Sequence, residues 1–130
     1  MRALLCLDIG MKRTGVAFSE SGIVASPLLP VLERHSLIAD VISLVADRNI
    51  GTLVIGMPNR IDDSPTPQTK LVEAVVVQLR DALRTAGLDP EIIPYNEFGS
   101  TRSAKRRFPD LDDNAGAATL LLQEYLDSTI

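Results

Sequence analysis

Near its N-terminus the chain carries two apolar runs joined by a short turn, with a single carboxylate where the turn begins. The first run, residues 4–7, is continuous and leads into Asp8 and Gly10, and the second run, residues 16–18, follows Gly15. A short apolar run that ends in a glycine turn and is followed by another such run predicts a β-hairpin whose first strand is buried. The remaining elements therefore have to pack around a sheet that begins with this hairpin.

Asp8 is the unusual residue of the hairpin, because both of its neighbours, Leu7 and Ile9, are apolar. A buried carboxylate without a partner is unfavourable or shifts its pKa, so Asp8 needs a cation, a group of hydrogen-bond donors or water. The local pattern leaves two interpretations open. Either Asp8 accepts backbone N–H groups of the turn over residues 10–15, as Asp often does in turns, or it belongs to a functional site.

The rest of the chain alternates between short apolar runs and stretches with helical periodicity. Prolines interrupt the first of these runs, which is typical of an edge strand, and Thr66 followed by Pro67 is typical of a helix start. We predict, in order, an edge strand over residues 23–32, a helix from an N-cap at Ser36 to near Asn49, a strand over 52–58, a helix over 67–86, a strand over 91–95, a basic helical segment over 102–107 and a helix over 115–126. The helix over 67–86 is expected to end at Gly87 and to turn a stripe of apolar residues inward, namely Leu71, Val75, Leu79, Leu83 and Ala86. This order predicts an α/β fold with a partly parallel sheet, helices on both faces and the hairpin at one edge.

Composition narrows the class of protein. The 130 residues are 45% apolar and 23% charged, which predicts one folded domain spanning residues 1–130. No apolar run is long enough to span a bilayer, and no signal-peptide pattern precedes the first strand, so we expect a cytoplasmic protein without a membrane partner. With one cysteine, Cys6, and one histidine, His35, an intrachain disulfide and a His-based triad are not expected. The net charge of −4 means that nucleic-acid binding would depend on local clusters of basic residues.

Four segments in order resemble the YqgF/RuvX family. They are DIGMKRTGVAFSE, VIGMP followed by a polar loop and a long helix, PYNEFGSTRSA, and AATLLLQEYL, and together they cover residues 1 to about 127. Members of this family are described as Holliday junction resolvases or as nucleases that mature the small-subunit ribosomal RNA precursor. The resemblance implies an RNase H-like fold with a mixed five-stranded sheet flanked by helices, and a role in ribosome biogenesis or in junction resolution.

The resemblance also implies an acidic active site that binds divalent metal, Mg²⁺ or Mn²⁺, for phosphodiester hydrolysis. By their place in the motifs, Asp8 and Glu97 correspond to the family's first two acids. The third family acid falls on Asn114, and a shift of one residue would bring Asp113 into its place. An amide oxygen can bind a metal with one negative charge fewer, so we expect weaker metal binding unless Asp113 substitutes. The alternative for Glu97 is a surface acid near Arg102.

Candidate nucleic-acid contacts lie after each of the two acids. They are Lys12, Arg13, Ser100, Thr101, Arg102, Lys105 and Arg106. The cations and hydroxyls suit phosphate contacts, but Ser100 is more readily a helix cap, and the basic segment is equally consistent with a solvated helix face. The aromatic residues that flank Glu97, Tyr95 and Phe98, are interpreted as core residues rather than as platforms for bases.

Three functional hypotheses follow. The first is a metal-dependent endonuclease or exonuclease that acts on structured RNA or DNA as a monomer or homodimer. The second is a catalytically weakened family member that binds nucleic acid or a ribosome-assembly partner without cutting, and the residues at positions 113 and 114 discriminate between the two. The third is a small actin-like nucleotide-binding fragment, because DxGxxxxG also occurs in actin-like ATPases. A chain of this length lacks their second phosphate loop and adenosine subdomain.

Overall fold

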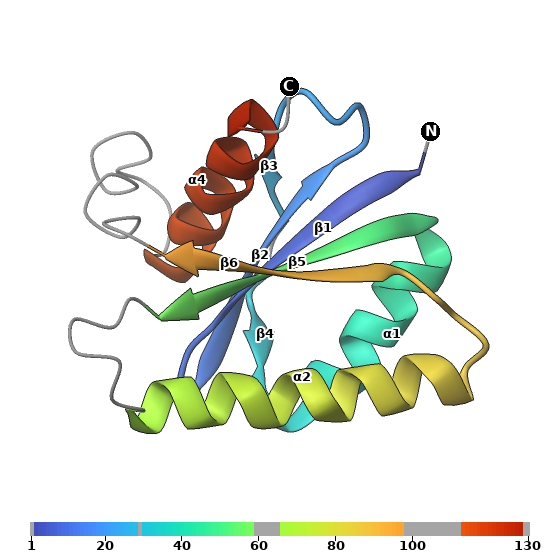
Figure 1. Cartoon of the computed structure of the whole chain (residues 1–130), viewed down its shortest axis with the longest axis vertical. Helices are drawn as coiled ribbons and strands as arrows, with labels where there is room; N and C mark the ends of the chain where they lie inside the picture. Colours follow the sequence, from blue (N-terminus) through green and yellow to red (C-terminus); the bar gives the residue numbers. More distant parts are fainter. Residues whose placement is uncertain (1, 29, 59–65, 98–112, 129–130) are drawn as a thin grey trace.

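The computed structural model describes residues 2–28, 30–58, 66–97 and 113–128, and of residues 58, 96, 97, 113 and 114 it describes the backbone (Figure 1). In chain order the elements are β1 (Ala3–Ile9), β2 (Arg13–Ser19), β3 (Ser26–Pro27), β4 (Leu32–Glu33), the 3₁₀ turn η1 (Arg34–Ser36), α1 (Leu37–Asp47), β5 (Ile50–Pro58), α2 (Pro67–Thr85), β6 (Glu91–Glu97) and α4 (Asp113–Ser128). None of the described helices is long and apolar enough to cross a membrane.

One mixed sheet contains all of these strands, in the order β3-β2-β1-β5-β6, with β4 also paired to β2. β1 and β2 form the predicted antiparallel hairpin, and β1, β5 and β6 are parallel. The predicted edge strand over residues 23–32 is present as two short strands, β3 and β4, that pair with different parts of β2. Pro27 and Pro30 each lack an N–H donor, so a continuous ladder cannot form there.

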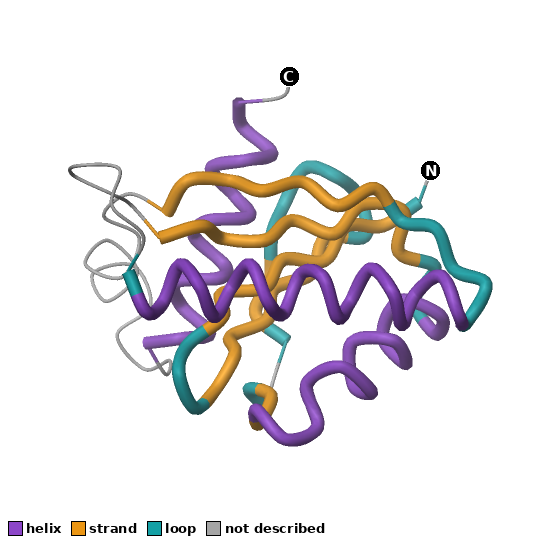
Figure 2. Tube along the Cα trace, turned by 60° about the horizontal axis from the view of Figure 1, so that its bottom comes forward, coloured by secondary structure: helices purple, strands orange, loops and turns teal. Residues whose placement is uncertain are grey.

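Helices cover both faces of the sheet, as predicted (Figures 1 and 2). Between the sheet and the helices α1 and α2, large aliphatic side chains form a buried cluster that includes Leu5, Leu7, Leu53, Ile55, Val41 and Leu79. The opposite face, under α4, is a second cluster of Leu4, Cys6, Ala17, Val54, Ala118, Leu121, Leu122 and Leu126. We call these faces the α1/α2 face and the α4 face.

The helix α2 begins and ends at the residues predicted to cap it. The Thr66 hydroxyl accepts the Thr69 N–H at 3.1 Å, and Pro67 occupies the first helical position. At the other end Gly87 has φ 75°, and the Leu88 N–H donates to the Leu83 carbonyl at 2.9 Å. A residue with positive φ after the last turn is the usual helix stop.

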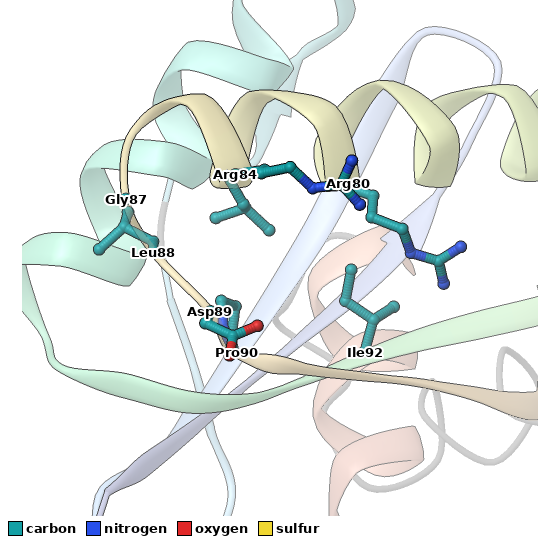
Figure 3. Close-up of a pocket in the computed structure, with 8 residues that line it drawn as sticks. Arg80, Arg84, Gly87, Leu88, Asp89, Pro90 and Ile92 are labelled. Carbon is teal, nitrogen blue, oxygen red and sulfur yellow. The ribbon is translucent and has the colours of Figure 1, made fainter.

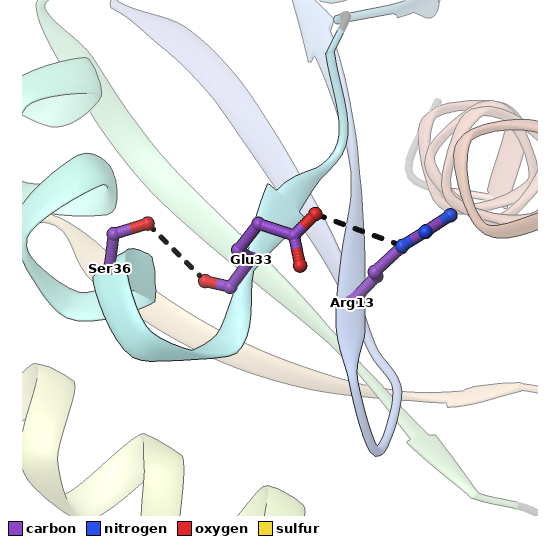
Figure 4. A network of polar contacts seen from close by, with 3 residues as sticks. All are labelled: Arg13, Glu33 and Ser36. Atoms are coloured by element: carbon purple, nitrogen blue, oxygen red, sulfur yellow. Dashed lines mark hydrogen bonds and ion pairs between the residues drawn. The ribbon is translucent and has the colours of Figure 1, made fainter.

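Two local predictions are wrong in detail. Ser36 makes no side-chain cap on α1; its hydroxyl donates instead to the Glu33 carbonyl at 3.5 Å, because η1 already supplies the first turn (Figure 4). In α2 the fully buried Val72 joins the stripe, while Leu71 is half-buried and Ala86 is exposed because the helix has ended.

Candidate functional site

The parallel strands end at one edge of the sheet, which we call the carboxyl edge and which consists of the ends of β1, β5 and β6 (Figure 1). Leu7 of β1 and Pro94 of β6 both pair with Ile55 of β5. Asp8 therefore lies one residue beyond this level, and Glu97 lies three residues beyond it. Because β1 and β6 are two strand spacings of about 4.8 Å apart and the two positions are offset by two residues of about 3.3 Å each, they are separated by about 10 Å across the sheet and about 7 Å along the strands.

The end of β1 is held in place on both sides. Asp8 is buried, with 8% of its surface exposed. Beyond it, the Gly10 N–H donates to the Arg13 carbonyl at 2.9 Å and closes the hairpin turn. The Gln68 side chain in the first turn of α2 donates to the Ile9 carbonyl at 3.0 Å. The Asp8 carboxylate is therefore carried by a backbone that other contacts fix.

Strand alternation assigns the two acidic positions to the same face of the sheet. Successive strand residues point to opposite faces. Leu7 belongs to the α1/α2 face and Cys6 to the α4 face, so Asp8 follows Cys6. In β6, Tyr95 packs with the α4 face, and position 97 follows it by the same rule. Both acids thus belong to the α4 face at the carboxyl edge.

The first turn of α4 lies at the same end of the molecule in both views (Figures 1 and 2). The helix begins at Asp113, and its Ala118 packs in one cluster with Cys6. Because residues four apart lie on one side of a helix, position 114 is on the side of α4 that faces the sheet. Positions 8, 97 and 114, predicted as metal ligands, therefore belong to one face and one end of the sheet, and position 113 is next to 114 at the start of α4.

The side chains around these positions are only partly described. Of the four predicted metal ligands, Asp8 is the one whose side chain the structure describes. Within the described part of the chain, no three His, Cys, Asp or Glu residues gather into a metal site. The carboxylate and amide oxygens at the four positions suit Mg²⁺ or Mn²⁺ in chemistry. The predicted contacts Ser100, Thr101, Arg102, Lys105 and Arg106, together with Phe98, lie outside the described residues.

The remaining predicted contacts, Lys12 and Arg13, are exposed in and after the hairpin turn. Arg13 Nε lies 3.8 Å from a carboxylate oxygen of Glu33, and both side chains are 54% exposed (Figure 4). An ion pair this exposed contributes about 0–1 kcal/mol, so a phosphate can compete for Arg13 at little cost.

Sequence reasoning missed Arg34, which the fold brings to the same turn. β4 pairs with the start of β2, with Glu33 opposite Arg13. The Arg34 N–H then donates to the Lys12 carbonyl at 3.1 Å. Nothing local in the sequence marks Arg34, because its position depends on pairing between two segments that a proline-containing loop separates.

Tyr95 is a packing residue, as predicted. Its ring meets Tyr125 of α4 edge to face, with centroids 5.6 Å apart and planes at 87°. Burial raises the pKa of the Tyr125 hydroxyl, and the charge of Glu91 raises it further. This aromatic contact stabilises the packing of α4 against β6 close to the carboxyl edge.

The sequence matches the family model "RuvX: Holliday junction resolvase" over residues 2–128. The chain belongs to the RuvX family. It is 35% identical over 132 residues to a "Putative pre-16S rRNA nuclease" of Dehalococcoides mccartyi, with 93% of this chain and 95% of that protein covered. A relative of the same name from Roseiflexus sp. (strain RS-1) is 30% identical over 137 residues, with 96% and 94% covered.

Solved structures similar to this RuvX-family chain confirm the predicted fold. T. thermophilus RuvC in complex with a Holliday junction substrate matches with a TM-score of 0.63 and 12% identity, over 99% of this chain and 96% of that one. The fowlpox virus Holliday junction resolvase matches with a TM-score of 0.56 and 10% identity, over 97% and 99%. At these identities the likeness establishes the RNase H-like fold.

Proposed function

We propose that this RuvX-family chain is a single-domain cytoplasmic nuclease that hydrolyses phosphodiester bonds of structured nucleic acid with Mg²⁺ or Mn²⁺. The substrate would be a small-subunit ribosomal RNA precursor or a four-way DNA junction, the two kinds named for its relatives. One observation carries the proposal: the parallel β1-β5-β6 ladder brings the positions of Asp8 and Glu97 to one edge and one face of the sheet.

The proposed ligands are Asp8, Glu97 and either Asn114 or Asp113. A divalent ion bound there supplies an activated water and stabilises the leaving oxygen. Asp8 contributes a fixed charge, because it stands on a buried strand whose end the hairpin turn and Gln68 hold. Preorganised charge of this kind does not have to reorient during the reaction.

For the third ligand the helical periodicity of α4 favours Asn114 over Asp113. Position 114 precedes the sheet-packed Ala118 by one turn, whereas position 113 precedes Ala117, which is buried but is not among the residues of the α4-face cluster. A neutral amide at this position lowers the charge of the site, and we expect the metal to bind less tightly than with three carboxylates. This is the observation that favours the alternative function, a binding protein with weakened catalysis.

The first experiment is a cleavage assay with Mg²⁺ and with Mn²⁺ on labelled single-stranded RNA, single-stranded DNA and a four-way junction. Asp8→Asn keeps the size of the side chain and removes its charge, and we expect it to lower cleavage by roughly 100-fold or more. Asp89→Asn makes the same change at an exposed residue on the far side of the molecule and should cleave like wild type. Wild-type cleavage that survives Asp8→Asn would overturn the proposed site.

The same assay with Asn114→Asp tests the third ligand. We expect this variant to need less Mn²⁺ for half-maximal activity than wild type, because it restores a negative charge. Cleavage by Asn114→Asp but not by wild type would establish the weakened binding protein instead. An unchanged Mn²⁺ requirement would exclude position 114 as a ligand and direct attention to Asp113.

A further inference from the structure

The outer side of α2 carries apolar side chains that are open to solvent. Val77, in the middle of the helix, is 57% exposed. Next to it a cavity of about 250 Å³ lies between α2 and the strands β5 and β6, and we call it the α2/β6 groove. The charged residues among its walls are Glu73 and Arg80, and the other walls are apolar, namely Ile55, Met57, Val76, Val77, Ile92 and Pro94. Apolar surface with a polar rim is typical of protein–protein contacts.

The groove continues along α2 into a second cavity of about 300 Å³, because Arg80 and Ile92 line both. Figure 3 shows the side chains of Arg80 and Arg84 extending from α2, with Ile92 of β6 opposite them. In the part of the chain that the structure describes, neither arginine forms an ion pair, and Glu73 forms none either. These charged groups can therefore pair with a partner without breaking an existing ion pair.

Four residues of α2 form a stripe along the groove in which an acid, two valines and a base follow one another. They have the spacing i, i+3, i+4 and i+7, which places side chains on one side of a helix, and they are Glu73, Val76, Val77 and Arg80. The valine pair is the centre of the stripe, and each charged residue stands three positions away from it, in opposite chain directions. The stripe is therefore complementary to an antiparallel copy of itself.

A twofold axis places the same surface patch on both subunits, so that residue i contacts residue j and j contacts i. When a second α2 lies antiparallel over the stripe, the valines of the two copies meet, and Glu73 of each copy lies opposite Arg80 of the other. The acid–base contact then forms twice. A parallel arrangement would instead bring Glu73 beside Glu73 and Arg80 beside Arg80, and like charges in a contact disfavour it.

We infer that the α2/β6 groove is the contact surface of a symmetric homodimer in which the α2 helices of two copies pack antiparallel. The valines and the apolar walls of the groove supply the apolar area that association removes from water, and the two Glu73–Arg80 pairs select the register. The proposed metal ligands belong to the α4 face, on the other side of the sheet, so this contact leaves them uncovered. The inference is independent of the proposed function, because it uses none of the residues of the proposed site.

The test measures the molar mass of the full chain in solution by sedimentation over a series of protein concentrations. Wild type should be a dimer that dissociates on dilution. Val77→Glu should weaken the dimer about 100-fold or more, because each copy would bring an unpaired carboxylate into the apolar contact. Val77 is exposed in the single chain, so the variant should stay folded, which circular dichroism checks. Ala46→Glu, at an exposed position of α1, adds the same charge elsewhere and should match wild type.

Reversal of the charges tests the antiparallel register. Glu73→Arg alone and Arg80→Glu alone each place like charges opposite one another twice, and each should weaken the dimer about 10-fold or more. The two changes together in one chain restore opposite charges and should recover most of the wild-type affinity. Arg84→Glu makes the same reversal one turn outside the stripe and should leave the dimer at least as tight as in wild type.

Each outcome decides the inference without reference to cleavage. A wild type that is monomeric at every concentration overturns it, and the groove would then be a contact for a different protein. A dimer that Val77→Glu leaves intact uses another surface and overturns it as well. A double charge reversal that restores nothing, or an Arg84→Glu variant that dissociates like Arg80→Glu, contradicts the antiparallel register. None of these results alters the nuclease proposal, which the Asp8→Asn assay tests.

Discussion

The two faces of the sheet are built from different kinds of residue. On the α1/α2 face, Leu7, Ile55 and Leu79 are fully buried aliphatic side chains. On the α4 face, the helix contributes one small residue, Ala118, and the leucines Leu121, Leu122 and Leu126 to the cluster. The α4 face also carries the buried acid of β1. The α1/α2 face is therefore purely aliphatic at its centre, whereas the α4 face combines buried leucines with a small residue, Ala118, and with the strand that carries Asp8.

Ala118 has a direct structural effect. A small residue near the start of α4 lets this part of the helix approach the sheet more closely than a leucine there would. The start of α4 then lies near the end of β1, where Asp8 is held. The difference between the faces implies that a cavity under α2 should impair folding, whereas extra bulk under α4 should impair the site.

The largest effect on stability is expected from Leu79→Ala. Leu79 is fully buried on the α1/α2 face, and removal of a buried leucine side chain typically costs about 2–5 kcal/mol of unfolding free energy. Urea denaturation measures this loss, and Leu79→Met, which conserves volume, should lose less than about 1.5 kcal/mol. Cleavage per folded molecule should stay near the wild-type rate. A specific rate that falls in step with stability would contradict the division between the faces.

A smaller loss of stability with a larger loss of activity is expected from Ala118→Leu. The extra side-chain volume between α4 and the hairpin costs about 1–3 kcal/mol, and it displaces the start of α4 from Asp8. Metal-dependent cleavage should therefore fall further for Ala118→Leu than for Leu79→Ala, although the latter is the less stable protein. Ala46→Leu, at an exposed position of α1, is the control for an added leucine. Full activity in Ala118→Leu would contradict the inference that the site requires α4 to pack closely against the sheet.

The smallest effect is expected from Glu124→Gln on α4. Burial raises the pKa of the Glu124 carboxyl above its usual value of 4.5, so the folded protein binds this proton more tightly than the unfolded chain does. The favourable contribution is complete below pH 4.5 and is lost as the pH rises through the folded-state pKa. Glu124→Gln should therefore flatten this part of the stability profile and stay within about 0.5 kcal/mol of wild type at pH 7. Thermal unfolding from pH 4 to pH 7 measures it, with exposed Glu20→Gln as the unaffected control.

Sequence patterns predicted well those elements whose formation is determined by neighbouring residues in the chain. The Thr66 cap, the stop at Gly87 and the apolar run of β5 each depend on residues close together in the chain. The segment over residues 23–32 was predicted as one edge strand interrupted by prolines, and the structure has two short strands there that pair with different parts of β2. Ser36 was placed correctly at the helix start, but its bonding depends on the turn before it.

The residues of the candidate site also differ in whether the local sequence indicates them. Asp8 stands out by itself, because it is an acid within an apolar run. Glu97 and position 114 entered through motif resemblance, since nothing in their own surroundings indicates that β6 and α4 meet β1. Arg34 was not singled out, because its place beside the hairpin turn depends on the pairing of β4 with β2. Pairing between distant segments is the information that local patterns do not contain.

The position of β6 has a consequence for the behaviour of the protein in solution. It is the last strand in the order of the described sheet, and an edge strand offers backbone groups to which another chain can add. Pro94 lies in the middle of β6 and has no N–H to offer such a chain. Among the described residues no strand pairs with the outer side of β6, and the missing donor at Pro94 disfavours the growth of the sheet into aggregates along this strand.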